Sequence, residues 1–520
     1  MSDPNLNALW SRAVAEELHR AGCAQVVLCP GSRNSPLLFA LKAVFGDDAW
    51  SWIDERGAAF AAYGAAKACG RPVAVCVTSG TAVANTVPAL CEAAVAGVPL
   101  LVLAADRPWE VQDRGAPQTM GQAGLAGDQV TEVRIGEPSA TDEALIALRS
   151  RISQATQAGG PRLIHLPFRD PLPPLPDPAF RADHLGDLAR NGRRDRPFVQ
   201  VGAHQGVLPA ERVDWWCGET DLAGLDYLRP GLKGLIVCGA DLAGGMSPWP
   251  VELAKTTGFP LLADATAGLR GEDLGPAELL VQGPCRDLHP DLIIRIGPAP
   301  LARATVEWLK KQTCPVVAID DGQDRDWLGQ SWTRIARPAP ATWRALGQAL
   351  AHGDTAWAKR WHQAATRCAD RHAAWAGTAP WSSALAAHRA VNHPRFAHVH
   401  LAASMSLRLG EVHLRRSAQV HAARGVNGID GCIAAFAGAS RAYGGGGLLL
   451  LGDLAFLHDL NSLLLAKQQV DDGVIVVFDD DGGSIFDHLP VAQVPGYTPL
   501  VRTPQGADLL ALALATGLPA

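Results

Sequence analysis

Two segments near the C-terminus decide the fold of this chain: LLLLGDLAFLHDLNSL (448–463) and VIVVFDDDGGSIF (474–486). Each starts as an apolar strand and ends in a turn that contains glycine and aspartate. Asp453 follows the first strand and Asp480 follows the second, with a helical pattern between them. Oxygen ligands at two neighbouring strand ends can hold one hard divalent cation, which in turn can hold a diphosphate. The two segments therefore predict a parallel sheet with a metal–diphosphate site at its carboxyl edge.

Continuous apolar runs of the same kind recur along the whole chain and alternate with helical patterns. Examples are AQVVLCP (24–30), PVAVCVTSG (72–80), PLLVLAAD (99–106), DLIIRIG (291–297) and GVIVVFDD (473–480). Runs rich in Val, Ile and Leu without polar alternation are typical of strands buried on both faces, as in the parallel sheets of α/β proteins. The predicted fold class is therefore α/β, with doubly wound parallel sheets.

The chain has 520 residues, which is too many for one hydrophobic core. A proline-dense stretch, LPFRDPLPPLPDP (166–178), cannot continue a helix or a central strand and marks one boundary. A second boundary lies at 338–380, in a helical segment rich in Trp, His and Ala. These boundaries predict three domains, at residues 1–180, 190–340 and 380–520.

The composition narrows the class of protein. The chain has 48% apolar residues, 19% charged residues and a formal net charge of −6, which gives no sign of a nucleic-acid partner. The N-terminus lacks the basic and apolar regions of a signal peptide, and no apolar segment predicts a membrane span. The eleven cysteines are scattered without a CxxC pair, which fits free thiols in a reducing cytoplasm better than a disulfide framework.

The spacing of Gly452-Asp453 and Asp480 resembles the magnesium–diphosphate motif of thiamin-diphosphate (ThDP) enzymes. The resemblance implies ThDP as the cofactor and Mg2+, or alternatively Mn2+, as the metal. It also bears on Glu55, which stands where an Ala-rich helix is expected to begin, in DERGAAFAAYGAAKA (54–68). A carboxylate at a helix start usually only caps the helix or compensates its dipole. In a ThDP enzyme, a glutamate instead shares a proton with N1′ of the aminopyrimidine ring of the cofactor.

Four arginines flank the proposed cofactor site. Arg33 lies in CPGSRNSPL (29–37), a strand–turn–helix joint whose backbone N–H groups can bind an anion. Arg107 follows another predicted strand of the same sheet, and Arg408 and Arg424 precede the metal motif. Each guanidinium has two interpretations, a surface ion pair or the recognition of a substrate carboxylate.

Longer segments resemble one ThDP family in detail. They are residues 54–108, GAPQTMGQ (115–122), RGVNGIDG (424–431), GDLAFLHDLNSL (452–463) and GGSIFDHLP (482–490). These segments resemble the 2-succinyl-5-enolpyruvyl-6-hydroxy-3-cyclohexene-1-carboxylate synthase (MenD) family. The resemblance implies three domains of the ThDP-enzyme type and a decarboxylating carboligase, a transferase of menaquinone biosynthesis. In its reaction, 2-oxoglutarate loses CO2 and the resulting succinyl-semialdehyde carbanion adds to isochorismate.

The resemblance also implies roles for single residues. Glu55 would activate ThDP, Ile429 would hold it in a bent shape, and Asp453, Asp480 and the backbone carbonyl of Gly482 would ligate the metal. The implied catalytic residues are Glu55, Arg33, Arg107, Gln118, Arg408 and Arg424. The implied cofactor-binding residues are Glu55, Thr78, Ser79, Gly80, Ser404, Ile429, Gly452, Asp453, Leu454, Asp480, Gly482, Gly483, Ile485 and Phe486. The implied substrate-binding residues are Ser32, Arg33, Arg107, Gln118, Arg303, Ser404, Arg408, Arg424 and Leu489.

The chain departs from the family pattern near the metal motif. Asp479-Asp480 stands where the family usually has Asn-Asn, so that four carboxylates, with Asp453 and Asp481, would gather beside the diphosphate. The third domain is expected to be shortened, because the strand and helix that normally follow 503–518 have no counterpart. That shortening would leave a sheet edge exposed.

Two other functions remain open. One is a different ThDP-dependent 2-oxoacid decarboxylase or carboligase, and the other is a non-catalytic scaffold homologue. The presence of Glu55 and of all four arginines argues against the scaffold. The resemblance further implies a homodimer or homotetramer with active sites between chains.

Overall fold

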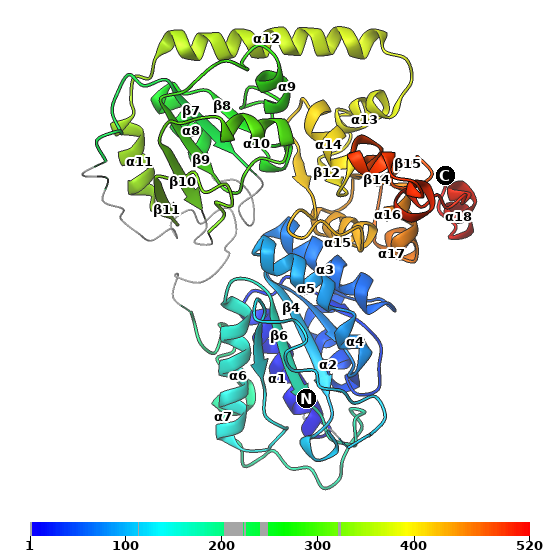
Figure 1. Cartoon of the computed structure of the whole chain (residues 1–520). Helices are drawn as coiled ribbons and strands as arrows, with labels where there is room; N and C mark the ends of the chain where they lie inside the picture. Colours follow the sequence, from blue (N-terminus) through cyan, green and yellow to red (C-terminus); the bar gives the residue numbers. More distant parts are fainter. Residues whose placement is uncertain (1–2, 113, 202–221, 223–224, 240–247, 321–323) are drawn as a thin grey trace.

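The computed structural model describes residues 3–112, 114–201, 222, 225–239, 248–320 and 324–520. It contains three parallel β-sheets with helices on both faces, which confirms the predicted α/β class (Figure 1). In Figure 1 the first sheet lies at the bottom, the second at the upper left and the third at the right. Among the described residues, no helix combines the length and the apolar character that crossing a bilayer requires.

The first sheet has the strand order β2-β1-β3-β4-β6-β5. Its strands are β1 (Gln25–Leu28), β2 (Ala49–Ser51), β3 (Val73–Val77), β4 (Leu100–Asp106), β5 (Thr131–Arg134) and β6 (Arg162–Pro167). One face is covered by α1 (Leu6–Arg20), α2 (Ser35–Phe45), α6 (Asp142–Gln157) and α7 (Asp187–Asn191). The other face is covered by α3 (Glu55–Cys69), α4 (Thr81–Ala84) and α5 (Val87–Ala96). Val73, Val75 and Val77 face the core under α3, whereas Ala74 and Cys76 face the core under α1, which explains the uninterrupted apolar sequence of β3.

The second sheet has the strand order β11-β10-β9-β7-β8. Its strands are β7 (Gly234–Cys238), β8 (Leu261–Ala263), β9 (Leu292–Ile296), β10 (Val316–Asp320) and β11 (Thr333–Ala336). One face is covered by α8 (Trp249–Thr257) and α11 (Pro340–Ala349), and the other by α9 (Ala277–Gln282) and α10 (Arg303–Lys310).

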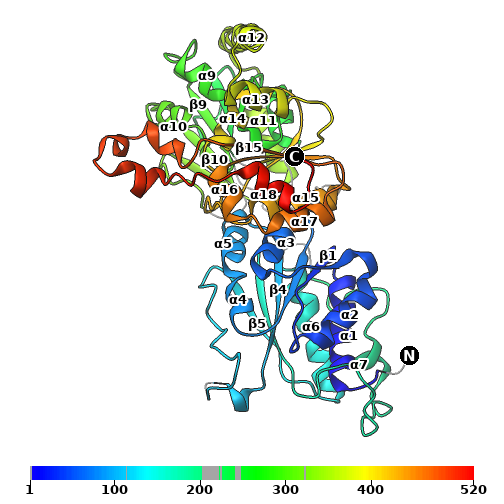
Figure 2. The ribbon, with the colours of Figure 1, turned by 90° about the vertical axis from the view of Figure 1, so that its right-hand side faces the viewer.

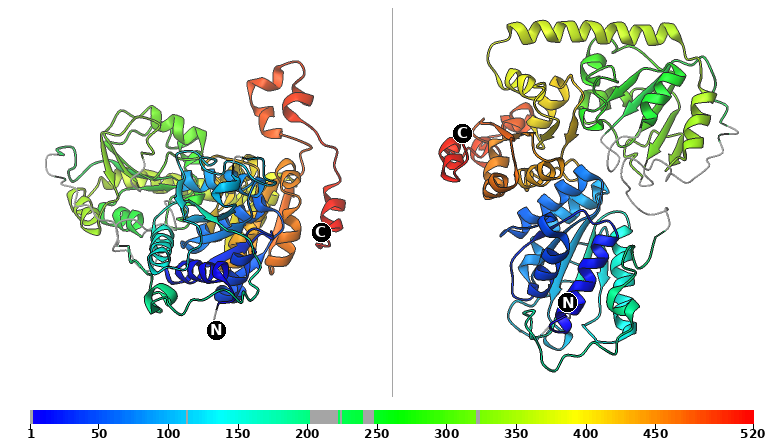
Figure 3. Two further views of the ribbon diagram at one scale, coloured as in Figure 1. Left: turned by 90° about the horizontal axis from the view of Figure 1, so that it is seen from below. Right: turned by 180° about the vertical axis from the view of Figure 1, so that it is seen from behind.

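The third sheet has the strand order β13-β12-β14-β15. Its strands are β12 (His398–Leu401), β13 (Gln419–His421), β14 (Gly447–Gly452) and β15 (Val474–Phe478). Its helices are α13 (Ser383–Val391), α14 (Met405–His413), α15 (Cys432–Tyr443), α16 (Asp453–His458), α17 (Ser462–Gln469) and α18 (Leu509–Ala515). The segment between β15 and α18 stands away from the sheet, as Figure 2 and the left view of Figure 3 show in red.

Helix α12 (Thr355–Thr378) has 24 residues and connects the second domain to the third along the top of Figure 1. Its first turns are anchored on the second domain, where the ring N–H of Trp357 donates to the carbonyl of Gly234 at 2.8 Å and Trp361 packs edge-on against Trp308. The two domains are also joined by a buried ion pair, in which the guanidinium of Arg270 lies 2.8 Å from the carboxylate of Glu411 on α14.

The first and third domains meet through helices α3 and α15, which are both rich in Ala and Gly. The helices touch backbone to backbone, because neither has bulky side chains at the crossing. A Cβ atom on Gly64 would lie 2.0 Å from the carbonyl oxygen of Ala435, and one on Gly438 would lie 1.9 Å from that of Ala61. Glycine is therefore required at both positions for the helices to approach so closely.

We expect Gly438→Ala to destabilise the protein, because the added methyl group must push α3 and α15 apart. Overpacking of this kind costs about 1–3 kcal/mol of the free energy of unfolding. Gly377→Ala, near the exposed end of α12 with no atom in reach of its Cβ, is the matched control and should be neutral or slightly stabilising. Urea titrations of both variants test this, and equal midpoints would show that the helices can separate without cost.

Candidate active site

The two turns that carry the predicted metal ligands lie against each other. Asp453 starts α16 directly after β14, and it is only 5% exposed. Its Oδ2 accepts a hydrogen bond from the backbone N–H of Gly482 at 2.6 Å. Burial raises the pKa of Asp453, and the negative charges of Asp479 and Asp480 raise it further. A bound divalent cation would offset this repulsion, and two carboxylates with a carbonyl are suitable donors for Mg2+. The residues present therefore fit the implied metal.

The turn after β15 depends on unusual backbone angles and on its contact with the C-terminal segment. Asp481 has φ +50° and Gly482 has φ +124°, and a Cβ on Gly482 would lie 2.3 Å from the carbonyl oxygen of Arg502. The carboxylate of Asp481 accepts backbone N–H groups from Gln505 at 3.0 Å and Gly506 at 2.9 Å. Asp481 thus fastens the C-terminal segment, and its charge is partly compensated there.

Glu55 occupies the first turn of α3, but the residue that caps this helix is Asp54. The carboxylate of Asp54 accepts the backbone N–H groups of Arg56 at 3.1 Å and Gly57 at 3.2 Å. It also accepts the side-chain amide of Asn461 at 2.7 Å. Within the described part of the chain, Glu55 makes no hydrogen bond or ion pair through its carboxylate. This carboxylate is therefore available to a ligand. Capping of α3 does not explain the presence of Glu55, because Asp54 already caps the helix.

The beginning of α3 is tied to the end of α16 in the third domain. Arg56 donates to the carbonyl of His458 at 2.9 Å, and its guanidinium lies 3.6 Å from the buried carboxylate of Asp459. Helix α16 has six residues and spans about 8 Å between Asp453 and His458. The predicted activating residue, Glu55, thus stands near one end of this short helix, and the predicted metal ligand stands at the other.

Arg107 is held by a turn that the sequence segment GAPQTMGQ forms beside β3. Its guanidinium donates to the hydroxyl oxygen of Ser79 at 2.6 Å and to the carbonyl of Gln118 at 2.8 Å. Gln118 has φ +60° and donates through its side chain to the carbonyl of Ser79 at 3.1 Å. Burial lowers the pKa of Arg107, and the positive charge of Arg33 lowers it further. Two guanidiniums of like charge side by side favour a bound carboxylate between them.

Arg33 also has a partner within the protein. Its guanidinium donates to the carbonyl of Phe168 at 2.9 Å and lies 3.2 Å from the carboxylate of Asp170. The side chain of Asp170 is 76% exposed, so this ion pair contributes little to stability. Both interpretations of Arg33 are thus compatible with the structure. Nearby, the hydroxyl of Thr78 is buried without a partner among the described residues.

A second pair of arginines lies in the third domain. Arg408 on α14 donates to the carbonyl of Ser404, which starts the helix with φ +81°, at 2.8 Å. Arg424 donates to the side-chain oxygen of Asn427 at 2.8 Å. Burial lowers the pKa of Arg408, and the positive charge of Arg424 lowers it further. The structure therefore groups the four arginines in two pairs of like charge, one in each domain.

Some predicted site residues lie apart from these groups. Arg303 starts α10 in the second domain and is exposed, without a described hydrogen bond to the other site residues. Phe486 and Leu489 lie on the segment that stands away from the third sheet and are 38% and 41% exposed. Ile485 belongs to the same short turn of 3-10 helix. Their predicted contacts with cofactor or substrate stay predictions.

Glu92 is a residue that the sequence reasoning missed. It lies on α5 and is 1% exposed, although the rest of this helix is apolar. Its carboxylate accepts the backbone N–H groups of Gly425 and Val426 at 2.7 Å each, and the hydroxyl of Tyr63 donates to it at 3.4 Å. Glu92 thus fixes the loop of residues 424–431 from the opposite domain. The sequence did contain a signal for this role, because Glu92 is the one charged residue in the apolar helix VPALCEAAVA.

Comparisons with known proteins show which family the chain resembles along its length. The family model described as the thiamine pyrophosphate enzyme, N-terminal TPP binding domain, matches residues 10–125. Three similar curated proteins carry the name 2-succinyl-5-enolpyruvyl-6-hydroxy-3-cyclohexene-1-carboxylate synthase. The protein of Myxococcus xanthus is 36% identical over 98% of this chain and 89% of its own length. That of Halobacterium salinarum is 37% identical over the same shares, and that of Geobacillus kaustophilus is 34% identical over 96% and 87%.

We expect Glu92→Ala to lower the free energy of unfolding by about 1–3 kcal/mol, because two backbone N–H groups of the 424–431 loop lose a charged acceptor. The loop that carries Arg424 should loosen as well, so that substrate affinity falls. Glu92→Gln keeps one acceptor oxygen, so it should lower the free energy of unfolding by less than Glu92→Ala. Glu143→Ala, at an exposed position in α6, is the control. Urea unfolding tests the assignment, and a Glu92→Ala variant as stable as the control would contradict it.

Proposed function

The chain belongs to the 2-succinyl-5-enolpyruvyl-6-hydroxy-3-cyclohexene-1-carboxylate synthase family of ThDP enzymes, and we propose how its residues carry out this synthesis. In the proposed reaction, a step of menaquinone biosynthesis, 2-oxoglutarate loses CO2. The remaining four-carbon unit then forms a carbon–carbon bond to isochorismate.

The cofactor would be held from both domains. When bound, ThDP supplies a stabilised carbanion next to a former carbonyl carbon. Asp453, Asp480 and the carbonyl of Gly482 hold Mg2+, or alternatively Mn2+, and through the metal the diphosphate. Glu55 would hold a proton at N1′ of the aminopyrimidine ring, and Ile429 would lie against the cofactor and favour its bent form. The support for Glu55 is its carboxylate, which has no described partner in the protein.

The observation that carries the substrate assignment is the grouping of four arginines in two pairs of like charge. The hydrogen-bond partners of Arg107, Arg408 and Arg424 are carbonyl, hydroxyl and amide oxygens, and the only carboxylate paired with Arg33 among the described residues is the largely exposed Asp170. Both proposed substrates are dicarboxylates, so each can neutralise one pair. We assign isochorismate to Arg33 and Arg107, with Ser32 and Gln118 beside them. The carboxylate derived from 2-oxoglutarate is assigned to Arg408 and Arg424, with Ser404.

A homodimer or homotetramer in the cytoplasm is also part of this proposal. Several large apolar side chains of the C-terminal segment are more than half exposed and would suit a contact with a second copy: Val494, Leu500, Leu510 and Leu514. The cysteines among the described residues are all free, as in a reducing compartment.

An assay of the purified chain with ThDP, Mg2+, 2-oxoglutarate and isochorismate tests the proposed function. We expect isochorismate to disappear in step with CO2 release. Release of CO2 without use of isochorismate would instead indicate a different ThDP decarboxylase or carboligase. If ThDP does not bind at any Mg2+ concentration, the chain is a non-catalytic scaffold.

We expect Glu55→Gln to bind ThDP but to lose at least about 100-fold in turnover, because an amide cannot exchange the proton that activates the cofactor. Exchange of the C2 proton of bound ThDP, followed by NMR in D2O, should slow by a similar factor. Glu143→Gln, also in the first turn of a helix but exposed, is the control. A near-normal exchange rate in Glu55→Gln would contradict the assignment of Glu55 as the residue that activates ThDP.

We expect the two arginine pairs to separate the half-reactions. Arg107→Ala should reduce kcat/KM for isochorismate by about 10–100-fold, the value of a charge-assisted hydrogen bond, and affect CO2 release less. Arg408→Ala should instead weaken the use of 2-oxoglutarate. Measuring CO2 release with and without isochorismate separates the two effects. An equal loss of both half-reactions in both variants would show that the pairs do not have separate substrates.

A further inference from the structure

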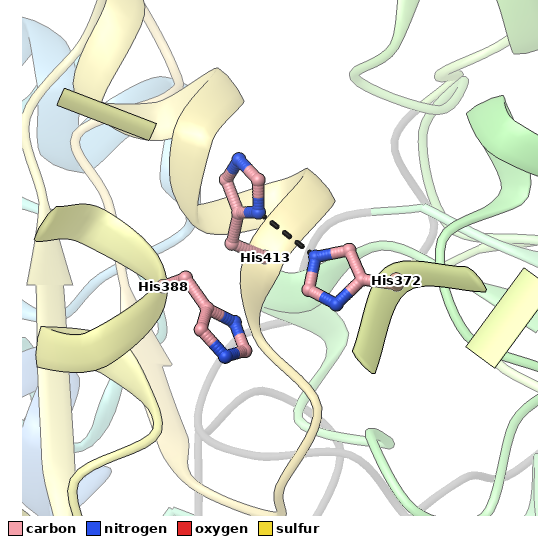
Figure 4. A group of neighbouring side chains, drawn as sticks. All are labelled: His372, His388 and His413. Carbon is pink, nitrogen blue, oxygen red and sulfur yellow. Dashed lines mark hydrogen bonds between the residues drawn. The ribbon is translucent and has the colours of Figure 1, made fainter. Parts of the chain in front are cut away.

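Three histidine side chains converge where the long helix α12 reaches the third domain, outside the candidate active site (Figure 4). His372 comes from α12, His388 from α13 and His413 from α14. One ring nitrogen of each residue lies within 4.8 Å of the corresponding atoms of the other two. Nε2 of His372 and Nδ1 of His413 are joined by a hydrogen bond of 3.0 Å, drawn as the dashed line in Figure 4.

The three rings carry no positive charge that would repel a metal ion. Burial lowers the pKa of His372 to about 3 and that of His413 to about 4, and it lowers the pKa of His388 as well. In the hydrogen bond between His372 and His413 one of the two nitrogens carries the N–H proton, so this proton must move to the other nitrogen of its ring before both residues can bind a metal.

The surrounding residues hold the rings in place. Trp375, one turn after His372 on α12, stacks on His413 with ring centroids 5.0 Å apart and an interplanar angle of 19°. The side-chain amide of Asn392 donates to the carbonyls of His388 and His413 at 2.8 Å each, which ties the end of α13 to the end of α14. The side-chain amide of Asn392 also lies 3.1 Å from Nδ1 of His388, so both packing and hydrogen bonds set the positions of the rings.

We propose that His372, His388 and His413 bind one Zn2+ ion, which connects α12 to α13 and α14. In a tetrahedral zinc site with Zn–N distances near 2.0–2.1 Å, ligand nitrogens are about 3.3 Å apart. The pair His372–His413 is already at 3.0 Å, and the third ring must move by roughly 1–2 Å to reach this spacing. Water would take the fourth position. Imidazole ligands select Zn2+ over Mg2+, so this site would be distinct from the predicted Mg2+ site at Asp453.

The charge that opposes cation binding is Arg415, whose positive charge also lowers the pKa of His372 and His413. The carboxylates of Asp273 and Glu411 offset only part of this charge, because burial and the positive charge of Arg270 still lower the pKa of Arg415 to about 10. The positive charges of Arg389 and Arg415 both lower the pKa of His388. All three ligands are neutral and the nearby charges are positive. We therefore expect the affinity for Zn2+ to be lower than that of a site with a carboxylate ligand.

Zinc at this position would add a second link between α12 and α14, beside the hydrogen bond between His372 and His413. Helix α14 also carries Arg408, so the metal would fix the helix that presents this guanidinium. The zinc site itself does not depend on the proposed function, because its ligands are outside the cofactor site.

Calorimetry with Zn2+ on the full chain, saturated with ThDP and Mg2+, tests the proposal. We expect one Zn2+ per chain in the unmodified protein. His388→Ala should bind it more than about 100-fold more weakly, beyond the range of an outer-shell change. His362→Ala is the matched control, since His362 lies on the same helix α12 but is exposed and bonded to the carbonyl of Ala358. It should bind Zn2+ like the unmodified protein.

The melting temperature gives a second readout. Zn2+ should raise Tm of the unmodified protein and of His362→Ala, but not of His388→Ala. If His388→Ala does not fold, His372→Gln replaces it, because His372 is half-buried and its amide substitute keeps a polar group of similar reach. Absence of Zn2+ binding by the unmodified protein, or equal affinity of the cluster variants and the control, would overturn the proposal.

Discussion

The backbone contact between α3 and α15 is the constraint on which the candidate site depends. The two helices can approach only because glycine and alanine occupy the crossing, and this approach brings the start of α3 to the end of α16. Arg56, the neighbour of Glu55, then contacts the end of the short helix that begins at Asp453, although the two helices come from different domains. Ala-rich helices contribute little hydrophobic area of their own. Their value here is close approach, which larger apolar side chains would prevent.

Electrostatics impose a second constraint, since the candidate site brings side chains of like charge close together. Arg33 lies beside Arg107, Arg408 lies beside Arg424, and Asp453 faces two further carboxylates. Each group would be more stable apart from its neighbour. The repulsion within each pair disappears when a ligand of opposite charge binds, so part of the binding energy arises from strain that the fold maintains. Functional sites commonly sacrifice stability in this way.

The three parallel sheets could be predicted from the sequence because apolar strand runs are a local signal, visible without knowledge of contacts. The identity of the helix cap could not, since Asp54 and Glu55 are adjacent carboxylates and the residue at which α3 begins decides which of them caps it. Glu92 was missed for the same reason, because its partners lie more than three hundred residues away. The three clustered histidines come from three helices and form no sequence motif. The roles of the single site residues remain predictions that rest on the family resemblance.

Helix α12 has a consequence for how the chain can be divided. Its buried residues, Trp357, Trp361 and Ala364, all belong to its first half, and beyond them the helix runs largely exposed over a total length of about 36 Å. Between Ala364 and the contacts of His372 and Trp375 with the third domain, the helix has few packed side chains, so this part opens locally more often than the sheets do and is then accessible to a protease. A cut there would leave all three sheets intact and the buried pair of Arg270 and Glu411 in place. The two fragments would stay associated, so the chain has the architecture of a split protein whose halves are held together by their interface and not by the covalent connection.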